Sequence, residues 1–263
     1  MRHMATSPAL RVLITGSAGR LGTAAVLALR AAGHFVRGYD QSPTPLASEH
    51  LIGSVLDPAK LDAAFRDISA LIHLAAAPDD SDEPGFVEGT LIPSNITGVY
   101  QVLEAAKRQG IRRLVLASTG QVNWTQQYEG PLPVRLHDSV TPKQWYAATK
   151  MFLESVGYSY ATQHHAEVIA VRLGWCPRRG QAAEIAASHT AQDVYLSPMD
   201  AGRFFERTIA AEIPQGFHLL YATSRPPRNL ILDLEPAARL LNWHPLEQWP
   251  TGAEDSLHPE TKF

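Results

Sequence analysis

The sequence predicts an α/β protein built on a doubly wound parallel sheet, and three observations support this fold class. Short apolar runs alternate along the chain with longer segments of helical periodicity. A glycine-rich loop follows the first apolar run. The chain has 263 residues, 45% of them hydrophobic, which is enough to bury one large core. Strands and helices that alternate in this way require right-handed crossovers, so the strands run parallel and helices cover both faces of the sheet.

The elements follow in order from the apolar patterns. The expected strands are 11–15, 34–40, 70–76, 112–119, 167–175 and 216–222, and the expected helices are 20–33, one around 61–65, 88–110, 142–165, 197–212 and one beginning at 233. For the helix at 142–165, Ser139 or Thr141 is a possible N-cap and Pro142 stands near the first turn. Ser197 is the expected cap of the helix that follows it. The alternation becomes less regular after Gly174.

Composition and charge exclude several classes of protein. The formal net charge is −3, and no basic stripe or polybasic segment indicates binding to nucleic acid or to a membrane surface. No apolar run approaches the roughly 18 residues of a membrane-spanning helix. Cys176 is the one cysteine, so the chain has no internal disulfide, and we expect a reducing, cytoplasmic setting.

The loop "LITGSAGRLG" joins the first strand to the first helix and predicts a nucleotide site. Its glycines at 16, 19 and 22 have the spacing G-x-x-G-x-x-G. Gly16 allows a tight turn, Gly19 lets the backbone approach a pyrophosphate, and Gly22 allows close packing of helix on strand. The N-terminus of the following helix adds N–H groups and the positive end of its dipole. Together these features are typical of a Rossmann-like dinucleotide-binding unit.

Asp40 indicates which dinucleotide is bound. It ends the second strand, where a carboxylate accepts hydrogen bonds from both hydroxyls of the adenosine ribose and repels a 2′-phosphate. The residues that follow, "QSPTPL", contain no arginine. Of the nearby cations, Arg37 is interpreted as a solvated surface residue. The sequence therefore predicts NAD rather than NADP as the cofactor.

The stretch "QWYAATK" contains a candidate acid/base pair. Tyr146 and Lys150 are four positions apart, so they share one face of the predicted helix. A neighbouring ammonium favours the phenolate, and we expect Lys150 to lower the pKa of Tyr146. Such spacing is common by chance, and its meaning depends on the glycine loop and on Thr119, which ends the strand "RRLVLAST".

In this order the glycine loop, Asp40, "HLAAA", "SNITG", "AST-GQ-V", "YAATK" and "LLNWHP" resemble the extended short-chain dehydrogenase/reductase family, in a short and atypical form. The same motifs characterise the NAD-dependent epimerase/dehydratase group. The resemblance implies that Tyr146 exchanges a proton with the substrate, that Lys150 tunes Tyr146 and holds the nicotinamide ribose, and that Thr119 hydrogen-bonds the substrate oxygen. Ser118 is the alternative to Thr119. Asn95 would position a water or the backbone around Lys150.

The resemblance also implies which residues line the two halves of the site. The expected cofactor-binding residues are Gly16, Gly19, Arg20, Leu21, Gly22, Asp40, Ser54, Val55, Leu74, Ala75, Ala76, Tyr146, Lys150 and Leu173. The expected substrate-binding residues are Ala77, Pro78, Thr119, Gly120, Gln121, Trp175, Arg178 and Arg179. Ser54 stands where the family usually has an aspartate, and Asp57 is expected to be an ordinary helix cap.

Within the family the chain is most similar to the uronate dehydrogenases, which oxidise C1 of a free hexuronic acid with NAD. The likeness lies in its length, "NITGVYQVLEAAKRQG", "VRLGWCP" and "VYLSPMDAGRFF". Pro78, Gly120-Gln121 and Trp175 replace polar residues of those enzymes, and Arg178 or Arg179 could replace their carboxylate-binding arginine only approximately. The resemblance therefore supports an NAD-dependent oxidoreductase of carbohydrate metabolism that acts on a sugar, a sugar acid or another small alcohol or carbonyl compound.

Two other functions remain open: a sugar-nucleotide epimerase or dehydratase, and a non-catalytic, NAD-binding regulatory protein. We expect no metal. The acidic run 79–83 is interpreted as a solvated loop, with a clamp for a cation or a basic substrate as the alternative. The family implies a homodimer. We divide the chain into a start of 1–10, a tag or a disordered segment, an NAD-binding catalytic domain over 11–175, and a small substrate-capping region over 176–263 packed on that domain.

Overall fold

The computed structural model describes residues 9–178 and 180–253, which form a seven-stranded sheet of parallel strands. The expected start at 1–10 therefore lies almost entirely outside the described residues. The strand order is β3-β2-β1-β4-β5-β6-β7. The order reverses between β1 and β4, and in a doubly wound sheet ligands bind at the carboxyl ends of the strands beside such a reversal.

The strands have the following bounds: β1 Arg11–Thr15, β2 Phe35–Asp40, β3 Glu49–Ile52, β4 Ala70–His73, β5 Arg113–Thr119, β6 Glu167–Leu173 and β7 Gly216–Ala222. The helices are α1 Arg20–Ala31, α2 Pro58–Ala64, α3 Pro84–Phe86, α4 Gly98–Arg108, α5 Trp124–Glu129, α6 Trp145–His164, α7 Ala182–Ala186, α8 His189–Asp193, α9 Pro198–Ala210 and α10 Glu235–Leu241. Two π-helical segments, Val87–Leu91 and Pro93–Thr97, lie between α3 and α4, and a 3-10 turn, Gly120–Asn123, follows β5.

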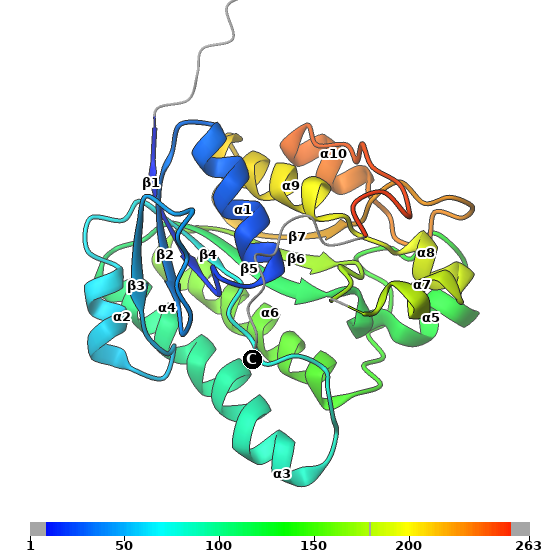
Figure 1. Ribbon diagram of the computed structural model, residues 1–263, viewed down its shortest axis with the longest axis horizontal. Coiled ribbons are helices and arrows are strands. Elements are labelled where there is room, and N and C mark those ends of the chain that lie inside the picture. The colour runs from blue at the N-terminus through cyan, green and yellow to red at the C-terminus, as the bar shows by residue number, and fades with distance from the viewer. Residues whose placement is uncertain (1–8, 179, 254–263) are drawn as a thin grey trace, which may run out of the picture.

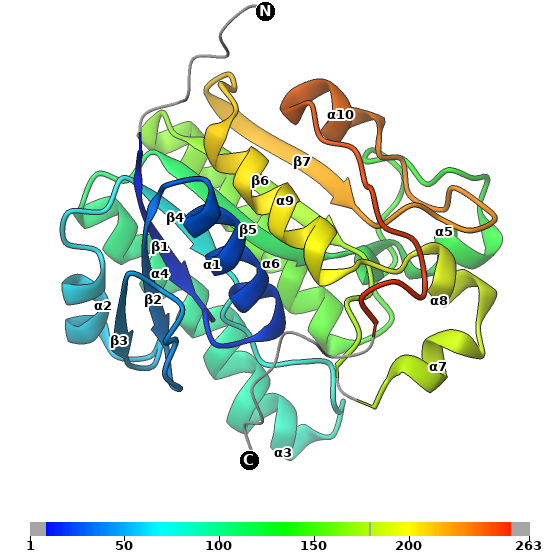
Figure 2. The same ribbon diagram turned by 45° about the horizontal axis from the view of Figure 1, so that its top comes forward.

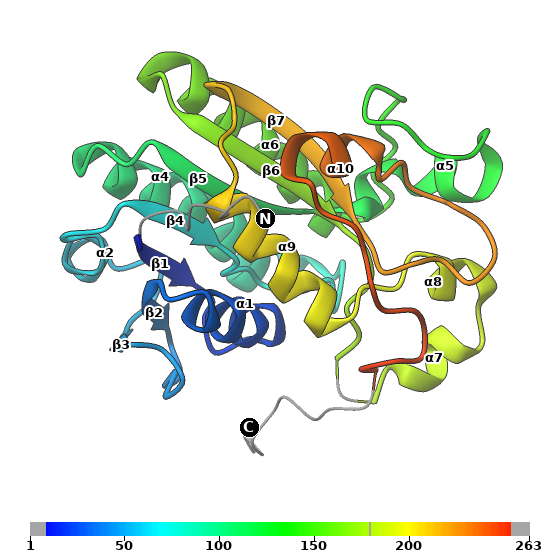
Figure 3. The ribbon, with the colours of Figure 1, turned by 90° about the horizontal axis from the view of Figure 1, so that it is seen from above.

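Helices cover both faces of the sheet, as Figures 1 and 3 show. On one face α1, α9 and α10 bury an apolar cluster that includes Leu29, Phe204 and Phe205. On the other face α2, α4 and α6 bury a second cluster that includes Phe65 and Leu153. This three-layer arrangement confirms the fold class that the alternating pattern predicts.

The long helix expected over 88–110 is interrupted. The N–H of Ile92 donates to Val87 O and that of Gly98 donates to Pro93 O, so each turn spans five residues. Pro93 has no N–H to continue an α-helical ladder. A π-helical turn in this position places Asn95 on the inner side of the helix, where it is 1% exposed.

The expected start of the long helix at 142 is wrong, because α6 begins at Trp145 with Gln144 as its N-cap residue. Thr141 does not cap α6. Its hydroxyl instead accepts from Thr125 N (3.1 Å) and donates to Gln126 Oε1 (2.5 Å), so it holds the start of α5. The N–H of Trp145 donates to Asp82 Oδ1 (3.1 Å) from the acidic run. The elements β3, α5, α7 and α8 are also absent from the sequence prediction.

The residues after 175 contribute to the main layers as well as to the carboxyl edge. β7 pairs with β6 along its whole length, and α9 packs closely against α1. In Figure 2, α5, α7 and α8 gather beyond the carboxyl ends of β5 and β6. Whether the region over 176–263 caps a substrate stays a prediction. None of the helices in the described part of the chain has the length and apolar character needed to cross a bilayer.

Candidate functional site

The glycine loop packs so tightly on β4 that its glycines cannot carry side chains. Gly16 has φ +72, and a Cβ there would lie 2.5 Å from Ala75 N. A Cβ on Gly22 would lie 2.1 Å from Gly16 O. Among the described residues, a Cβ on Gly19 would meet Gly16 O alone, at 3.3 Å. Gly16 and Gly22 are therefore packing glycines, and the open side of the loop is at Gly19.

Asp40 lies directly beside this loop. Its Oδ2 accepts from Ala18 N (3.1 Å) and its Oδ1 accepts from Ser42 N (3.0 Å). Arg37 is 6% exposed, so its interpretation as a solvated residue is wrong. Its guanidinium donates to Glu49 Oε2 and to the carbonyls of Ala64 and Arg66. A buried guanidinium with these partners is not available for a 2′-phosphate.

The residues expected at the adenine, Ser54 and Val55, have partners within the protein, and their role in binding stays a prediction. Ser54 Oγ accepts from Leu56 N (3.2 Å), and its carbonyl accepts from the hydroxyl of Tyr39 (2.7 Å). Its side chain is thus used within its own turn. Val55 is buried against Gly98, where a Cβ would lie 2.6 Å from the Val55 side chain. Asp57 caps α2 by accepting from Lys60 N, which confirms its prediction as a helix cap.

Asn95 connects the loop after β4 to α6. Its Oδ1 accepts from Ala77 N (2.8 Å), and its Nδ2 donates to Ala77 O (3.1 Å) and to Thr149 Oγ1 (3.1 Å). The hydroxyl of Thr149 donates in turn to Tyr146 O (2.7 Å). Asn95 therefore holds the backbone of the helix turn that carries Tyr146 and Lys150. Leu74 and Ala75 pack on the core at the end of β4, and Ala76 is exposed beside them.

The structure distinguishes Thr119 from its alternative, Ser118. The two residues end β5 and point to opposite faces of the sheet. Ser118 Oγ donates to Glu154 Oε1 (2.5 Å) and is 3% exposed, so it is engaged within the protein. Thr119 is the N-cap of the 3-10 turn and accepts from Gln121 N at 3.3 Å. Its hydroxyl keeps its own proton to donate, as a group that binds a substrate oxygen requires.

Tyr146 and Lys150 lie together on α6. Lys150 Nζ is 5.5 Å from the centroid of the Tyr146 ring and donates to Ala117 O (2.9 Å). Tyr146 packs against the apolar cluster of Ala77, Val87 and Leu91. Leu173 ends β6 next to Thr119 in the strand register. The predicted catalytic residues thus meet at the carboxyl ends of β4, β5 and β6.

Burial dominates the electrostatics of this pair. It lowers the pKa of Lys150 to about 8. It also raises the pKa of the Tyr146 phenol above its usual range, the charge of Asp79 adds to the rise, and Arg178 opposes it. The cation that acts on Tyr146 is thus Arg178 rather than Lys150, and the lowering of the Tyr146 pKa by Lys150 stays a prediction.

On the substrate side, the acidic run forms a bridge across the site and is not a simple solvated loop. Asp79 Oδ2 accepts from Gln121 Nε2 (2.7 Å), and Asp80 Oδ1 accepts from Arg178 Nη1 (2.5 Å). A second nitrogen of Arg178 lies 3.8 Å from Asp79 Oδ1. Three segments are thereby joined: the loop after β4, the turn after β5 and the loop after β6.

The other expected substrate residues surround this bridge. Ala77 and Gly120 are buried, and Pro78 is partly exposed. Trp175 is partly buried between two apolar clusters, and its Nε1 donates to Gln181 Oε1 at 3.5 Å. Arg179 lies outside the described residues.

Comparison with known proteins identifies the family. A model of the NAD dependent epimerase/dehydratase family matches residues 12–175. L-arabinose 1-dehydrogenase (NAD(P)(+)) of Haloferax volcanii is 30% identical over 227 residues, which are 78% of this chain and 84% of that protein. The chain belongs to the NAD-dependent epimerase/dehydratase family. It is an NAD-dependent oxidoreductase of that family.

A further relative and a solved structure are similar to this epimerase/dehydratase-family protein, and the relative is by name a uronate dehydrogenase. The enzyme of Pseudomonas syringae pv. tomato is 30% identical over 177 residues, which are 65% of this chain and 62% of that protein. The solved structure of glucuronic acid dehydrogenase from Chromohalobacter salexigens has a TM-score of 0.76 and 24% identity, and covers 93% of this chain and 87% of that one. The structural likeness confirms the fold that the resemblance implies.

The residues present in this family member fit NAD. None of the described side chains caps the N-terminus of α1 at Gly19, so the start of the helix faces the open side of the glycine loop. Asp40, at the adjacent strand end, presents its carboxylate beside that loop. The loop at Gly19 and the start of α1 would hold the pyrophosphate, and Asp40 would hold the adenosine ribose. Within residues 9–178 and 180–253, no three His, Cys, Asp or Glu side chains are grouped to bind a metal ion.

Sequence reasoning missed two residues of the site in this family member. His73, at the end of β4, is 1% exposed and its Nδ1 lies 2.7 Å from Thr15 Oγ1. Burial, with a smaller contribution from the charge of Lys150, lowers the pKa of His73 to about 3, so the ring is neutral. Asp79 is the second, because the sequence singles it out only as part of the acidic run 79–83 and does not predict its contact with Gln121.

Proposed function

We propose that this NAD-dependent oxidoreductase oxidises a hydroxyl of an uncharged free sugar. The observation that carries the proposal is the pairing of Arg178 with Asp79 and Asp80. Arg178 is the described cation best placed to receive a substrate carboxylate, and two carboxylates already neutralise it. An anionic sugar acid would have to displace them and would meet their repulsion, whereas sugar hydroxyls can donate hydrogen bonds to them. The relative from Haloferax volcanii is by name an arabinose dehydrogenase.

In the proposed reaction each predicted catalytic residue has a distinct task. Thr119 donates a hydrogen bond to the reacting oxygen, and Tyr146 removes the hydroxyl proton. The base form of Tyr146 is the phenolate, which becomes the neutral phenol when it takes the proton. Lys150 supplies positive charge next to that phenolate, and Asn95 fixes the helix turn that carries both residues. The hydride would pass to the nicotinamide of NAD, which is the oxidant that the cofactor would supply when bound. The base works in step with hydride departure, which is why a proton acceptor must be held at the reacting oxygen.

We expect each neutral aldose to be oxidised more efficiently than its uronate counterpart. Exposed ion pairs contribute about 0–1 kcal/mol each, so displacing two of them and meeting like charge predicts a preference of about tenfold or more in kcat/KM. The test measures NADH formation with D-galactose against D-galacturonate, D-glucose against D-glucuronate, and L-arabinose. A uronate that outperforms its aldose would overturn the proposed substrate class.

An Asp80→Asn variant tests the cause of this preference. The substitution removes the ion pair between Asp80 and Arg178. Arg178 is then freer to bind a substrate carboxylate, so the kcat/KM for a uronate divided by that for its aldose should rise several-fold. Asp82→Asn is the matched control, because it removes the same charge from the same loop but contacts Trp145 N rather than Arg178. An equal rise in both variants would mean that general charge, and not Arg178, decides the preference.

The two alternative functions are distinguished by product analysis with sugar nucleotides and by a measurement of NAD binding. Epimerisation or dehydration of a sugar nucleotide without net NADH formation would favour the hypothesis of an epimerase or dehydratase. A protein that binds NAD and turns over no alcohol would support a regulatory role. The described Tyr146, Lys150 and Thr119 favour catalysis, since a purely regulatory protein has no need for a proton acceptor there.

We further propose that the protein is a homodimer. The family resemblance supports this, and so do the exposed aromatic side chains Tyr100 on α4 and Tyr158 on α6, which are 59% and 61% exposed. Light scattering after size-exclusion chromatography should give about twice the 28.8 kDa of one chain. A molar mass of one chain at micromolar concentration would contradict the proposal.

We propose the cytoplasm as the compartment. The single cysteine, Cys176, fits a reducing environment. NAD-linked oxidation of small molecules also requires a pool of the dinucleotide. Recovery of the native protein from a secreted fraction in the source cell would argue against this location.

A further inference from the structure

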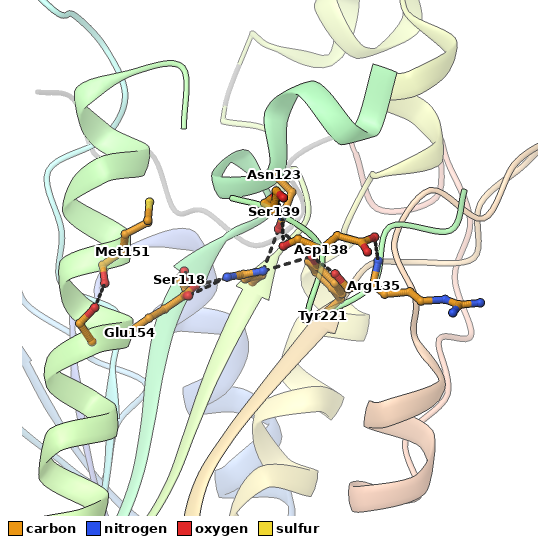
Figure 4. A network of polar contacts seen from close by, with 10 residues as sticks. Ser118, Asn123, Arg135, Asp138, Ser139, Met151, Glu154 and Tyr221 are labelled. Atoms are coloured by element: carbon orange, nitrogen blue, oxygen red, sulfur yellow. Dashed lines mark hydrogen bonds and ion pairs between the residues drawn. The ribbon is translucent and has the colours of Figure 1, made fainter. Parts of the chain in front are cut away.

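A buried polar network lies at the carboxyl ends of β5, β6 and β7, directly below the proposed catalytic residues. Figure 4 shows Ser118, Asn123, Glu154 and Tyr221 converging from four different elements. Arg172 on β6, whose side chain is 3% exposed, is the common partner of Asn123, Glu154 and Tyr221. Ser118 joins the network through Glu154. Neither the proposed chemistry nor the cofactor site uses these groups.

Arg172 is fully engaged with two distant parts of the chain. Its Nε donates to Glu154 Oε1 (2.9 Å) and its Nη2 donates to Glu154 Oε2 (2.8 Å), which is a bidentate pair with α6. Its Nη1 donates to Asn123 Oδ1 (2.8 Å), at the end of the 3-10 turn. The planar guanidinium thus fixes α6 and this turn relative to each other.

On the α6 side, two contacts one helical turn apart join the helix to consecutive residues of β5. Lys150 Nζ donates to Ala117 O (2.9 Å). Ser118 Oγ donates to Glu154 Oε1 (2.5 Å). Two such contacts prevent α6 from sliding or rotating against β5. The position of Tyr146, one turn before Lys150, is set by the same contacts.

On the Thr119 side, the network holds the turn that Thr119 begins. Thr119 is the N-cap of Gly120–Asn123, and Asn123 is its last residue. Asn123 Oδ1 also accepts from the Tyr221 hydroxyl (2.7 Å), and its Nδ2 donates to Ser139 O (2.9 Å). The turn is therefore anchored to β6, to β7 and to the loop before α6.

We propose that Arg172 and Glu154 are positioning residues that set the distance between Thr119 and the Tyr146/Lys150 pair. The inference rests on the proposed function of those three residues. A buried ion pair of this kind is costly to desolvate and is not in itself a strong source of stability. Its position, between the helix with the base and the turn with the hydroxyl, is what gives it a role in catalysis.

The chain contains a matched control for this pair. Arg113 on β5 and Glu167 on β6 form an ion pair at the amino ends of the strands whose carboxyl ends carry Thr119 and Arg172, with Arg113 Nε 2.6 Å from Glu167 Oε2. This pair is far along the strands from Thr119. Loss of either pair weakens the sheet, but only loss of the Arg172 pair should alter the catalytic geometry.

We expect Arg172→Met to lower kcat about 100-fold, the cost of displacing a reacting group by about 1 Å. The KM of the best sugar and the Kd of NADH should stay within about threefold. Glu167→Gln should leave kcat within about twofold. Equal losses of kcat in the two variants, or an unchanged kcat in Arg172→Met, would overturn the inference.

A second measurement needs no substrate. Trace acetylation with acetic anhydride over a pH series, followed by mass spectrometry of the Lys150 peptide, gives the titration midpoint of that amine. In the wild type and in Glu167→Gln we expect a midpoint near the pKa of about 8 that burial gives Lys150. In Arg172→Met the midpoint should rise by about one unit, because α6 loosens and Glu154 is left unpaired. An unchanged midpoint would overturn the inference.

If Arg172→Met does not fold, Ser118→Ala provides a second test of the positioning role. It removes one contact between α6 and β5 with little change of volume, and kcat should fall about fivefold to tenfold at unchanged KM. A wild-type kcat in Ser118→Ala would then contradict the positioning role. If the wild type oxidises no sugar, the proposed substrate fails, and the acetylation midpoint still decides the inference.

Discussion

Tyr146→Phe is expected to lower kcat about 1,000-fold with the best sugar, within the range for loss of a general acid or base. The substitution removes one hydroxyl and leaves the ring against Ala77, Val87 and Leu91. NAD affinity should therefore change less than tenfold, roughly 1.4 kcal/mol. NADH formation under saturating NAD gives kcat, and a fluorescence titration with NADH gives the affinity.

The pH dependence supplies a second sign of this role. Burial raises the pKa of the Tyr146 phenol, so its base form is scarce near neutrality. Oxidation by the wild type should therefore speed up as the pH rises above neutrality, since deprotonation supplies the base. In Tyr146→Phe the residual rate should lack this rise.

Tyr128→Phe is the matched control for Tyr146→Phe. Tyr128 lies on α5, is 53% exposed, and loses the same hydroxyl without touching the site. Its kcat should stay within about twofold of the wild type. Loss of NADH binding in Tyr146→Phe would make Tyr146 a structural residue, and an unchanged kcat would leave catalysis to another group.

The parts of the site that sequence predicts well are those specified by short-range patterns. The glycine loop is recognised within seven consecutive positions, and the Tyr146/Lys150 pair within one helical turn. Asp40 is recognised by its place at the end of one strand. Each pattern fixes backbone geometry locally, and a parallel sheet then brings all the strand ends to the same edge. The fold class and the three residues at the centre of the site follow from that rule.

The parts that sequence does not predict depend on contacts between distant segments. Asp82 receives the first N–H of α6 across 63 positions, and Arg178 reaches Asp80 across 98. No local pattern marks a carboxylate as the partner of a particular helix end or guanidinium. For the same reason Arg37 is misinterpreted as a surface residue, because its partners Glu49, Ala64 and Arg66 come together only after folding.

The π-helical turns illustrate the same limit within a single helix. The apolar pattern over 88–110 is helical and is correctly predicted as such. The pattern does not reveal that Pro93 widens the turn and so turns Asn95 toward Ala77 and Thr149. The resemblance to the family, and not the periodicity, is what identifies Asn95.

Gly22→Ala is expected to weaken both the fold and NAD binding. A Cβ at this position would lie 2.1 Å from Gly16 O and 2.6 Å from Ser17 Cα, and both are backbone atoms that cannot move independently of the loop. Overpacking of this kind costs about 1–3 kcal/mol of unfolding free energy. Separating the loop from α1 also displaces the N–H groups that face the pyrophosphate, so NAD affinity should fall more than tenfold. Urea denaturation and NADH titration measure the two effects.

Gly19→Ala separates these two causes. Among the described residues its Cβ would meet Gly16 O alone, at 3.3 Å, so the unfolding free energy should stay within about 1 kcal/mol of the wild type. The methyl group enters the open side of the loop, where the pyrophosphate is expected, and NAD affinity should still fall about tenfold. Equal stability losses in the two variants would contradict the division of the loop into packing and binding glycines. Unchanged NAD affinity in Gly19→Ala would show that the pyrophosphate does not bind close to this glycine, because one methyl group cannot displace a ligand that does not approach Gly19.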